Sequence, residues 1–81
     1  MRVRVKLFAV ARELAGHDEL ELAVADGATV AQVRQALAAA VPALGDVLPH
    51  ALLAVDAQYA GDATIINERS ELALIPPVSG G

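Results

Sequence analysis

The sequence predicts an α+β fold in which one main helix covers one face of a mixed sheet of four to five strands. Apolar and polar residues alternate near both ends of the chain, which is the signature of half-buried strands. One longer stretch with helical spacing lies between them. The chain has 81 residues, 18 of them alanine, so there is room for a single small aliphatic core.

The first element is a strand over residues 2–8. Its inner positions are aliphatic and its outer positions are mostly basic: Val3, Val5 and Leu7 alternate with Arg2, Arg4, Lys6 and Phe8. The basic row is expected to keep this face soluble rather than to bind a ligand. Phe8 is the apolar exception on the outer face.

A short helix and a second strand are expected next. Residues 10–15 have helical character, and Gly16 can end this helix because glycine adopts a left-handed backbone readily. Alternation returns in the run Glu19, Leu20, Glu21, Leu22, Ala23 and Val24. The two strands should pair antiparallel.

The main helix should begin after Thr29. Thr29 and Gln32 have the spacing of a capping box, which satisfies exposed amides at a helix start. Apolar residues then recur at helical spacing and should face the core: Val30, Val33, Leu37, Ala40 and Val41. Pro42 should stop the helix, and a crossover loop is expected over residues 42–49.

The last third of the chain predicts three strands. The continuous apolar run at 51–55 suits a buried strand, and 58–59 suits a brief edge strand, whereas 64–67 is ambiguous. Over 71–75, alternation places Leu72 and Leu74 inward and Ala73 and Ile75 outward. The prolines at 76 and 77 should end this strand, because proline cannot donate to the ladder.

This order of elements is that of the β-grasp, the ubiquitin-like roll, in which the first and last strands are parallel neighbours at the sheet centre. One helix can cover only one face of such a sheet. Phe8 and Ile75 would then lie together on the open face, and we interpret them as a surface for docking a protein partner. We expect residues 1–75 to form the β-grasp domain and residues 76–81 to be a flexible C-terminal tail.

Composition excludes several classes of function. A net charge of −4 and only two aromatic residues, Phe8 and Tyr59, disfavour nucleic acid as a partner. Without cysteine there is no disulfide, thiolate metal site or cysteine nucleophile. No run of about 18 apolar residues could span a membrane, and no signal peptide is visible, so we expect a cytoplasmic protein.

The remaining polar residues have ordinary interpretations. His17 and His50 are far apart, so no metal site is expected. Glu19 and Glu21 are best read as a solvated strand face, and Ser79 has no base placed beside it by the sequence. We therefore expect no catalytic residue on this chain alone and no bound cofactor.

The chain ends with Pro76, Pro77, Val78, Ser79, Gly80 and Gly81. Two prolines favour a semi-rigid extended spacer, and glycine without a Cβ can enter a narrow passage. The tail would present the carboxylate of Gly81 away from the domain. Once a partner adenylates it, this carboxylate becomes an electrophile for sulfur or nitrogen, so the tail suits a carried acyl group.

Both ends of the chain resemble the small sulfur-carrier subunit of molybdopterin synthase. The matching motifs are Val5-Lys6-Leu7-Phe8-Ala9 with Arg12-Glu13 and Gly16, and Leu74-Ile75-Pro76-Pro77-Val78-Ser79-Gly80-Gly81. Asp56 stands where that family often has asparagine, and Glu68-Arg69-Ser70-Glu71 stands where a Gly-Asp turn is usual. Both departures lie in turns.

The resemblance implies a route for sulfur. An activating enzyme would use ATP to adenylate Gly81, a sulfurtransferase donor would supply the sulfur of a thiocarboxylate, and the tail would enter the large catalytic subunit. There the sulfur would pass to cyclic pyranopterin monophosphate, forming the dithiolene of molybdopterin. This chain would be the non-catalytic sulfur-donor subunit, since an acidic carrier is poorly suited to hold an anionic pterin.

Three alternatives stay open. The same tail chemistry would serve a sulfur carrier for thiamine or tRNA thiolation, or a ubiquitin-like protein modifier. A different class of function is a β-grasp interaction module whose tail carries no chemistry.

Overall fold

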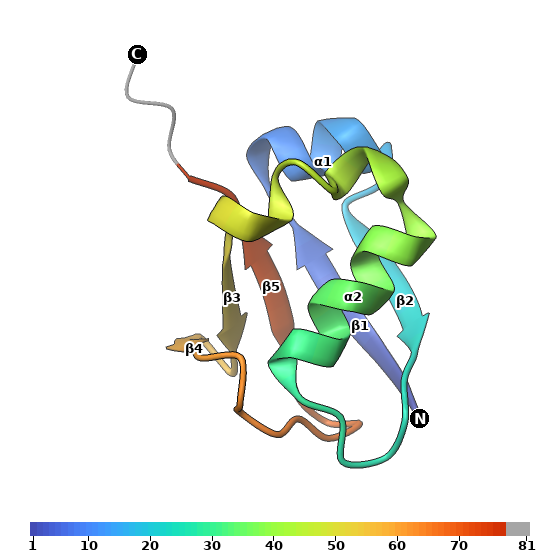
Figure 1. Cartoon of the computed structure of the whole chain (residues 1–81), viewed down its shortest axis with the longest axis vertical. Coiled ribbons are helices and arrows are strands. Elements are labelled where there is room, and N and C mark those ends of the chain that lie inside the picture. Colours follow the sequence, from blue (N-terminus) through green and yellow to red (C-terminus); the bar gives the residue numbers. More distant parts are fainter. Residues whose placement is uncertain (78–81) are drawn as a thin grey trace.

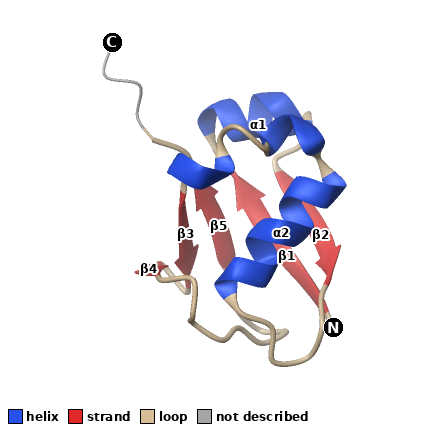
Figure 2. Cartoon of the chain, viewed as in Figure 1, coloured by secondary structure: helices blue, strands red, loops and turns tan. Residues whose placement is uncertain are grey.

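The computed structural model describes residues 1–77, which fold as one five-stranded sheet with α2 packed across it (Figures 1 and 2). The elements along the chain are β1 (Arg2–Leu7), α1 (Ala9–Ala15), β2 (Glu19–Ala23), α2 (Val30–Ala40), the 3-10 helices η1 (Pro42–Leu44) and η2 (Leu48–His50), β3 (Leu52–Val55), β4 (Gln58–Ala60) and β5 (Leu72–Ile75). The predicted α+β class and β-grasp architecture are confirmed.

The sheet has the order β2-β1-β5-β3-β4. β1 and β5 are parallel neighbours at its centre, with Val5 opposite Leu72 and Leu7 opposite Leu74. β1 also pairs antiparallel with β2, and β3 pairs antiparallel with both β5 and β4. Because β1 and β5 run in the same direction, both end at the edge of the sheet where α1 lies (Figure 1). Pro76, which follows β5, therefore lies near the end of β1.

The core forms between α2 and the inner face of the sheet. Thr29 and Gln32 make the expected capping box: the Thr29 amide donates to Gln32 Oε1 at 2.8 Å, and the Gln32 amide donates to Thr29 Oγ1 at 3.4 Å. Val30, Val33 and Leu37 of α2 are buried against the strands.

The prediction that Ala40 faces the core was wrong. Ala40 is exposed, and Val41 is only half-buried. The helix ends at Ala40, and the backbone of Val41 leaves the helical region at φ −133°. The helical spacing therefore no longer predicts which side of the chain faces the core at this point.

The segment predicted as a crossover loop over 42–49 is more ordered than expected, because it contains η1 and begins η2. Leu44 and Leu48 are buried and belong to the hydrophobic core. The side chain of Arg34 in α2 holds the segment in place, since Nη1 donates to the Leu48 carbonyl at 2.7 Å and Nη2 donates to the Ala51 carbonyl at 2.9 Å. The prolines indicated a break in the main helix but not these short helical turns.

The turn between β3 and β4 contains two residues with left-handed backbone, Asp56 at φ 51° and Ala57 at φ 67°. The Asp56 carboxylate accepts a hydrogen bond from the Glu71 amide at 2.9 Å, which fastens the turn to the segment before β5. Asp56 thus has a local partner, whereas Ala57 carries the steric cost of its Cβ in this conformation.

We expect Ala57→Gly to stabilise the fold by roughly 0.5 to 1 kcal/mol, because relief of the left-handed strain outweighs the greater freedom of glycine in the unfolded chain. Chemical denaturation measures the change. The matched control is Ala36→Gly in the middle of α2, which should destabilise the protein by about 1 kcal/mol or more. A destabilising Ala57→Gly would contradict this account of the turn.

We expect Leu37→Ala to destabilise the fold by ~2 to 5 kcal/mol, because Leu37 is fully buried and its truncation leaves a cavity. Glu21→Ala is the surface control and should change the free energy of unfolding by less than ~0.5 kcal/mol. Equal effects in denaturant titrations would show that the inner and outer faces are assigned wrongly.

Candidate functional site

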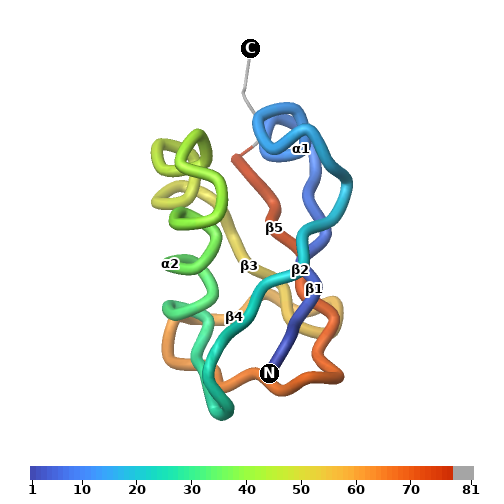
Figure 3. The backbone as a smooth tube through the Cα atoms, turned by 90° about the vertical axis from the view of Figure 1, so that its right-hand side faces the viewer, coloured from blue at the N-terminus to red at the C-terminus, as the bar shows by residue number. Residues whose placement is uncertain are grey.

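Within residues 1–77, the sheet face opposite α2 has no helix packed across it (Figure 3). Its β5, β3 and β4 portion is apolar: Ile75 is opposite Leu52, Ala73 is opposite Ala54, and Ala54 is opposite Tyr59. Leu52 is 50% exposed and Tyr59 68% exposed. We call Phe8, Leu52, Tyr59, Ala73 and Ile75 the apolar patch.

The two docking residues predicted from the sequence lie at neighbouring strand ends. Leu7 is opposite Leu74 in the parallel ladder, so continuing the register by one residue brings Phe8 beside Ile75. Phe8 is not part of β1, however, which ends at Leu7. Phe8 is instead the residue that caps the start of α1, with extended backbone and a 48% exposed side chain. Ala9 follows at φ 51° and turns the chain into α1.

Sequence analysis missed Leu52 and Tyr59. The apolar run 51–55 was predicted to be a buried strand, and Leu53 and Ala54 are buried, but Leu52 lies half exposed on the open face. A continuous apolar run has no alternation to show which side faces outward. Tyr59 was predicted to lie on a brief edge strand, as it does in β4, but the sequence did not show that its register opposite Ala54 places it on the open face.

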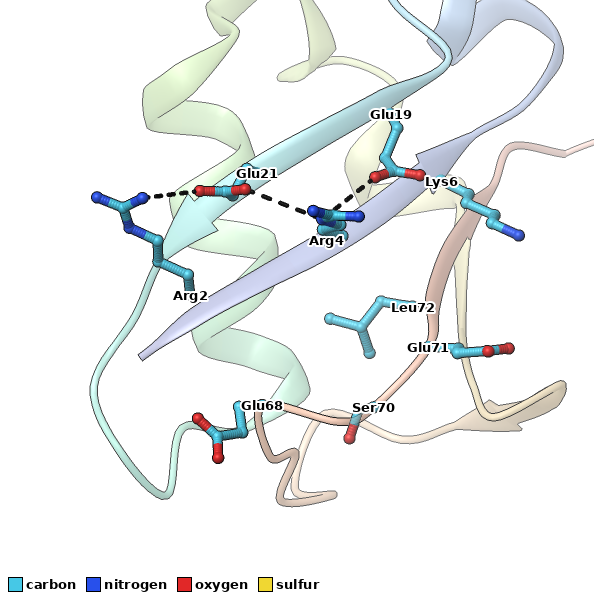
Figure 4. Close-up of a pocket in the computed structure, with 9 residues that line it drawn as sticks. All are labelled: Arg2, Arg4, Lys6, Glu19, Glu21, Glu68, Ser70, Glu71 and Leu72. Carbon is cyan, nitrogen blue, oxygen red and sulfur yellow. Dashed lines mark hydrogen bonds and ion pairs between the residues drawn. The ribbon is translucent and has the colours of Figure 1, made fainter.

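The β2 and β1 portion of the open face is charged. Arg2 Nη1 lies 3.2 Å from Glu21 Oε1, and Arg4 Nε lies 3.7 Å from Glu19 Oε1 and 3.9 Å from Glu21 Oε2. These side chains line a shallow hollow (Figure 4) together with Lys6, Glu68, Ser70, Glu71 and Leu72. Since its arginines are paired with glutamates, this hollow is not a basic site for a phosphorylated ligand.

The base of the tail is anchored in the sheet. β5 lies between β1 and β3 and ends at Ile75, as predicted, before Pro76 and Pro77. Pro76 is buried and Pro77 is exposed, so the first residue assigned to the tail packs on the domain. The other tail residues lie outside the described residues: Val78, Ser79, Gly80 and the expected modification site Gly81.

Residues 1–77 indicate neither a metal site nor a membrane-spanning helix. His17 and His50 are exposed, and no group of three or more His, Asp or Glu side chains there is placed to hold a metal ion. None of the helices in this part of the chain has the length and apolar character needed to cross a membrane.

Comparison with known proteins relates the whole chain to one family. The ThiS family model matches residues 5–81. The molybdopterin synthase sulfur carrier subunit of Arabidopsis thaliana is 40% identical over 81 residues, covering 100% of this chain and 84% of that protein. The protein of the same name from Chlamydomonas reinhardtii is 35% identical over 83 residues and is covered completely, as is this chain.

Solved structures share the fold. The crystal structure of SAMP1 from Haloferax volcanii superposes with a TM-score of 0.89 at 34% identity, covering 100% of both chains. Subunit 1 of a putative molybdopterin converting factor from Pyrococcus furiosus superposes with a TM-score of 0.84 at 26% identity, covering 96% of this chain and 99% of that chain. This chain belongs to the ThiS family, and its full-length relatives place it among the sulfur carrier subunits of molybdopterin synthase.

Proposed function

We propose that this protein carries sulfur for molybdopterin assembly as a thiocarboxylate on Gly81. The single observation that carries the proposal is the end of β5, where a central strand stops at Ile75 and a buried proline precedes the Pro-Val-Ser-Gly-Gly sequence. This base of the tail lies beside an exposed apolar patch. The similarity of this protein to sulfur carrier subunits over the whole chain supports the proposal.

The proposed chemistry begins with the carboxylate of Gly81. An activating enzyme would join it to the α-phosphate of ATP, releasing pyrophosphate and leaving an acyl-adenylate. A sulfur nucleophile from a sulfurtransferase donor would then displace AMP, and glycine hinders this attack least because it lacks a side chain. We place these steps in the cytoplasm, where the activating enzyme has access to ATP.

The proposed acceptor step takes place in a large catalytic subunit. The thiocarboxylate would transfer its sulfur to cyclic pyranopterin monophosphate, and two transfers would complete the dithiolene of molybdopterin. A solved complex of subunits 1 and 2 of molybdopterin-converting factor from Helicobacter pylori shares the fold of this chain, with a TM-score of 0.70 at 20% identity. The apolar patch is the surface we propose for such a partner, because it adjoins the point where the tail leaves the sheet.

A second candidate function is a ubiquitin-like protein modifier. It is favoured by the similarity to structures named small archaeal modifier protein 1, at 31% to 34% identity. Both functions start with the same adenylate, and they differ in whether sulfur or an amine attacks it. The intact mass of the protein from native cells separates them: a thiocarboxylate replaces one oxygen by sulfur, whereas modification of a protein leaves an amide-linked conjugate.

Adding one residue after Gly81, or deleting Gly81, should abolish acyl-adenylate formation and leave the fold intact. The proposed reactive atom is the carboxylate of Gly81, and the core is built from residues before the tail. Pyrophosphate exchange with the activating enzyme measures the reaction, and a melting curve checks the fold. Undiminished exchange by the extended protein would refute the carrier mechanism.

Ile75→Glu should weaken binding to the activating enzyme or the large subunit at least ~30-fold, because a charge would be buried at the centre of the proposed interface. The melting temperature should change little, since Leu72 and Leu74 hold the inner face of β5.

The matched control is Ile65→Glu, which changes a 69% exposed isoleucine outside the patch and should leave affinity unchanged. Calorimetric titration measures the affinity of the wild-type protein, Ile75→Glu and Ile65→Glu for the partner. Unchanged affinity of Ile75→Glu would refute docking through the patch, and a collapsed melting temperature would show that Ile75 stabilises the core.

A further inference from the structure

Lys6 is the only lysine in the chain, and it lies on the open face of the sheet. In the ladders of β1 it is opposite Glu19 on one side and Ala73 on the other. The Glu19 carboxylate is placed against Arg4 instead, at 3.7 Å. Figure 4 shows the Lys6 side chain extending away from Glu19 and towards β5. Lys6 makes no ion pair with any residue of the range 1–77.

The other cations of this face differ from Lys6. Arg2 and Arg4 are paired with Glu21 and Glu19 and lie towards the start of β1. Lys6 lies at the border between this charged network and the apolar patch, next to Ala73 and two residues before Phe8. It also lines a small hollow with Phe8, which joins it to the docking surface.

A partner that covers Phe8, Ala73 and Ile75 must also cover or closely approach Lys6. Removing an ammonium group from water is strongly unfavourable unless an opposite charge or hydrogen-bond acceptors replace the water. A carboxylate on the partner supplies both, and a partner without one leaves the lysine buried and unpaired. Charge complementarity at one position therefore discriminates between surfaces that are equally apolar.

We propose that the large subunit of molybdopterin synthase presents a carboxylate to Lys6 when it docks on the apolar patch, and that this pair selects the partner. The inference rests on the proposed function, which makes the patch the docking surface. The partner surface is then mostly apolar, with one acidic side chain opposite the β1 and β5 border. Lys6 is a specificity residue here and touches no reacting atom.

The test measures binding of wild-type protein, Lys6→Met and Lys6→Glu to the large subunit of the same organism by calorimetry, at low and high salt. Methionine keeps the length of the side chain and removes its charge. We expect binding to weaken about 10-fold for Lys6→Met and at least ~100-fold for Lys6→Glu at low salt, and the loss for Lys6→Met should shrink at high salt. Melting curves verify that both variants are folded.

Arg2→Met is the matched control, because it makes the same change of net charge on the same strand and face but at the far end of β1. It should bind within about twofold of wild type, since an exposed charge at the rim contributes little.

In a second arm, acidic residues of the large subunit are changed singly to lysine. One of these changes should restore binding of Lys6→Glu.

The outcomes separate the two proposals. If the wild-type protein does not bind, or if Ile75→Glu binds as well as wild type, the docking function itself fails. If Ile75→Glu binds weakly but Lys6→Met binds like wild type at both salt concentrations, docking stands and the Lys6 inference is overturned. Equal losses for Lys6→Met and Arg2→Met also overturn it, because they would show an effect of net charge alone.

Discussion

The parallel pairing of β1 with β5 is the interaction on which the rest of the structure depends. These strands come from opposite ends of the chain, and their facing residues Val5, Leu7, Leu72 and Leu74 are almost completely buried. Parallel neighbours require a long connection, and α2 lies within the connecting chain and covers the face on which these residues pack. The same pairing brings the end of β1 beside the end of β5, so the core and the base of the tail depend on one contact.

The open face of the sheet has a charged half on β1 and β2 and an apolar half on β5, β3 and β4. β1 and β2 carry arginine opposite glutamate, and exposed pairs of this kind add little to stability, so they mainly keep this half solvated. β5, β3 and β4 leave Leu52 and Tyr59 exposed and Ile75 partly exposed, and this apolar surface in contact with water has a cost in free energy. A partner that covers this apolar half would remove it from water and leave the charged half solvated.

Within residues 1–77, left-handed backbone outside glycine occurs at Ala9, Asp56 and Ala57. Ala57 lies in the β3–β4 turn, where a nearby hydrogen bond from Glu71 to Asp56 holds the chain. Ala9 lies at the end of β1, and its left-handed backbone turns the chain into α1 directly after Phe8. Strain is tolerated where surrounding structure enforces it. At Ala9 the turn into α1 directly follows Phe8, which belongs to the apolar patch.

The sequence by itself determined the features that are encoded over short distances. Alternation identified the inner face of β5, and the pair Thr29 and Gln32 identified the start of α2. The motifs at both ends of the chain identified the family. Each of these signals is local, because side-chain period and capping depend on residues a few positions apart.

Only the tertiary structure decided that Leu52 and Tyr59 join Phe8 and Ile75 on the open face. The run 51–55 gives no alternation, so the exposure of Leu52 follows from its register with Ile75. The prolines at 42 and 49 suggested a loop, whereas Leu44 and Leu48 pack in the core and Arg34 of α2 donates a hydrogen bond to the Leu48 carbonyl. Lys6 lacks an ion pair within residues 1–77, whereas Arg4 pairs with Glu19 across the strands. These contacts join residues far apart in the chain, and only the folded sheet brings them together.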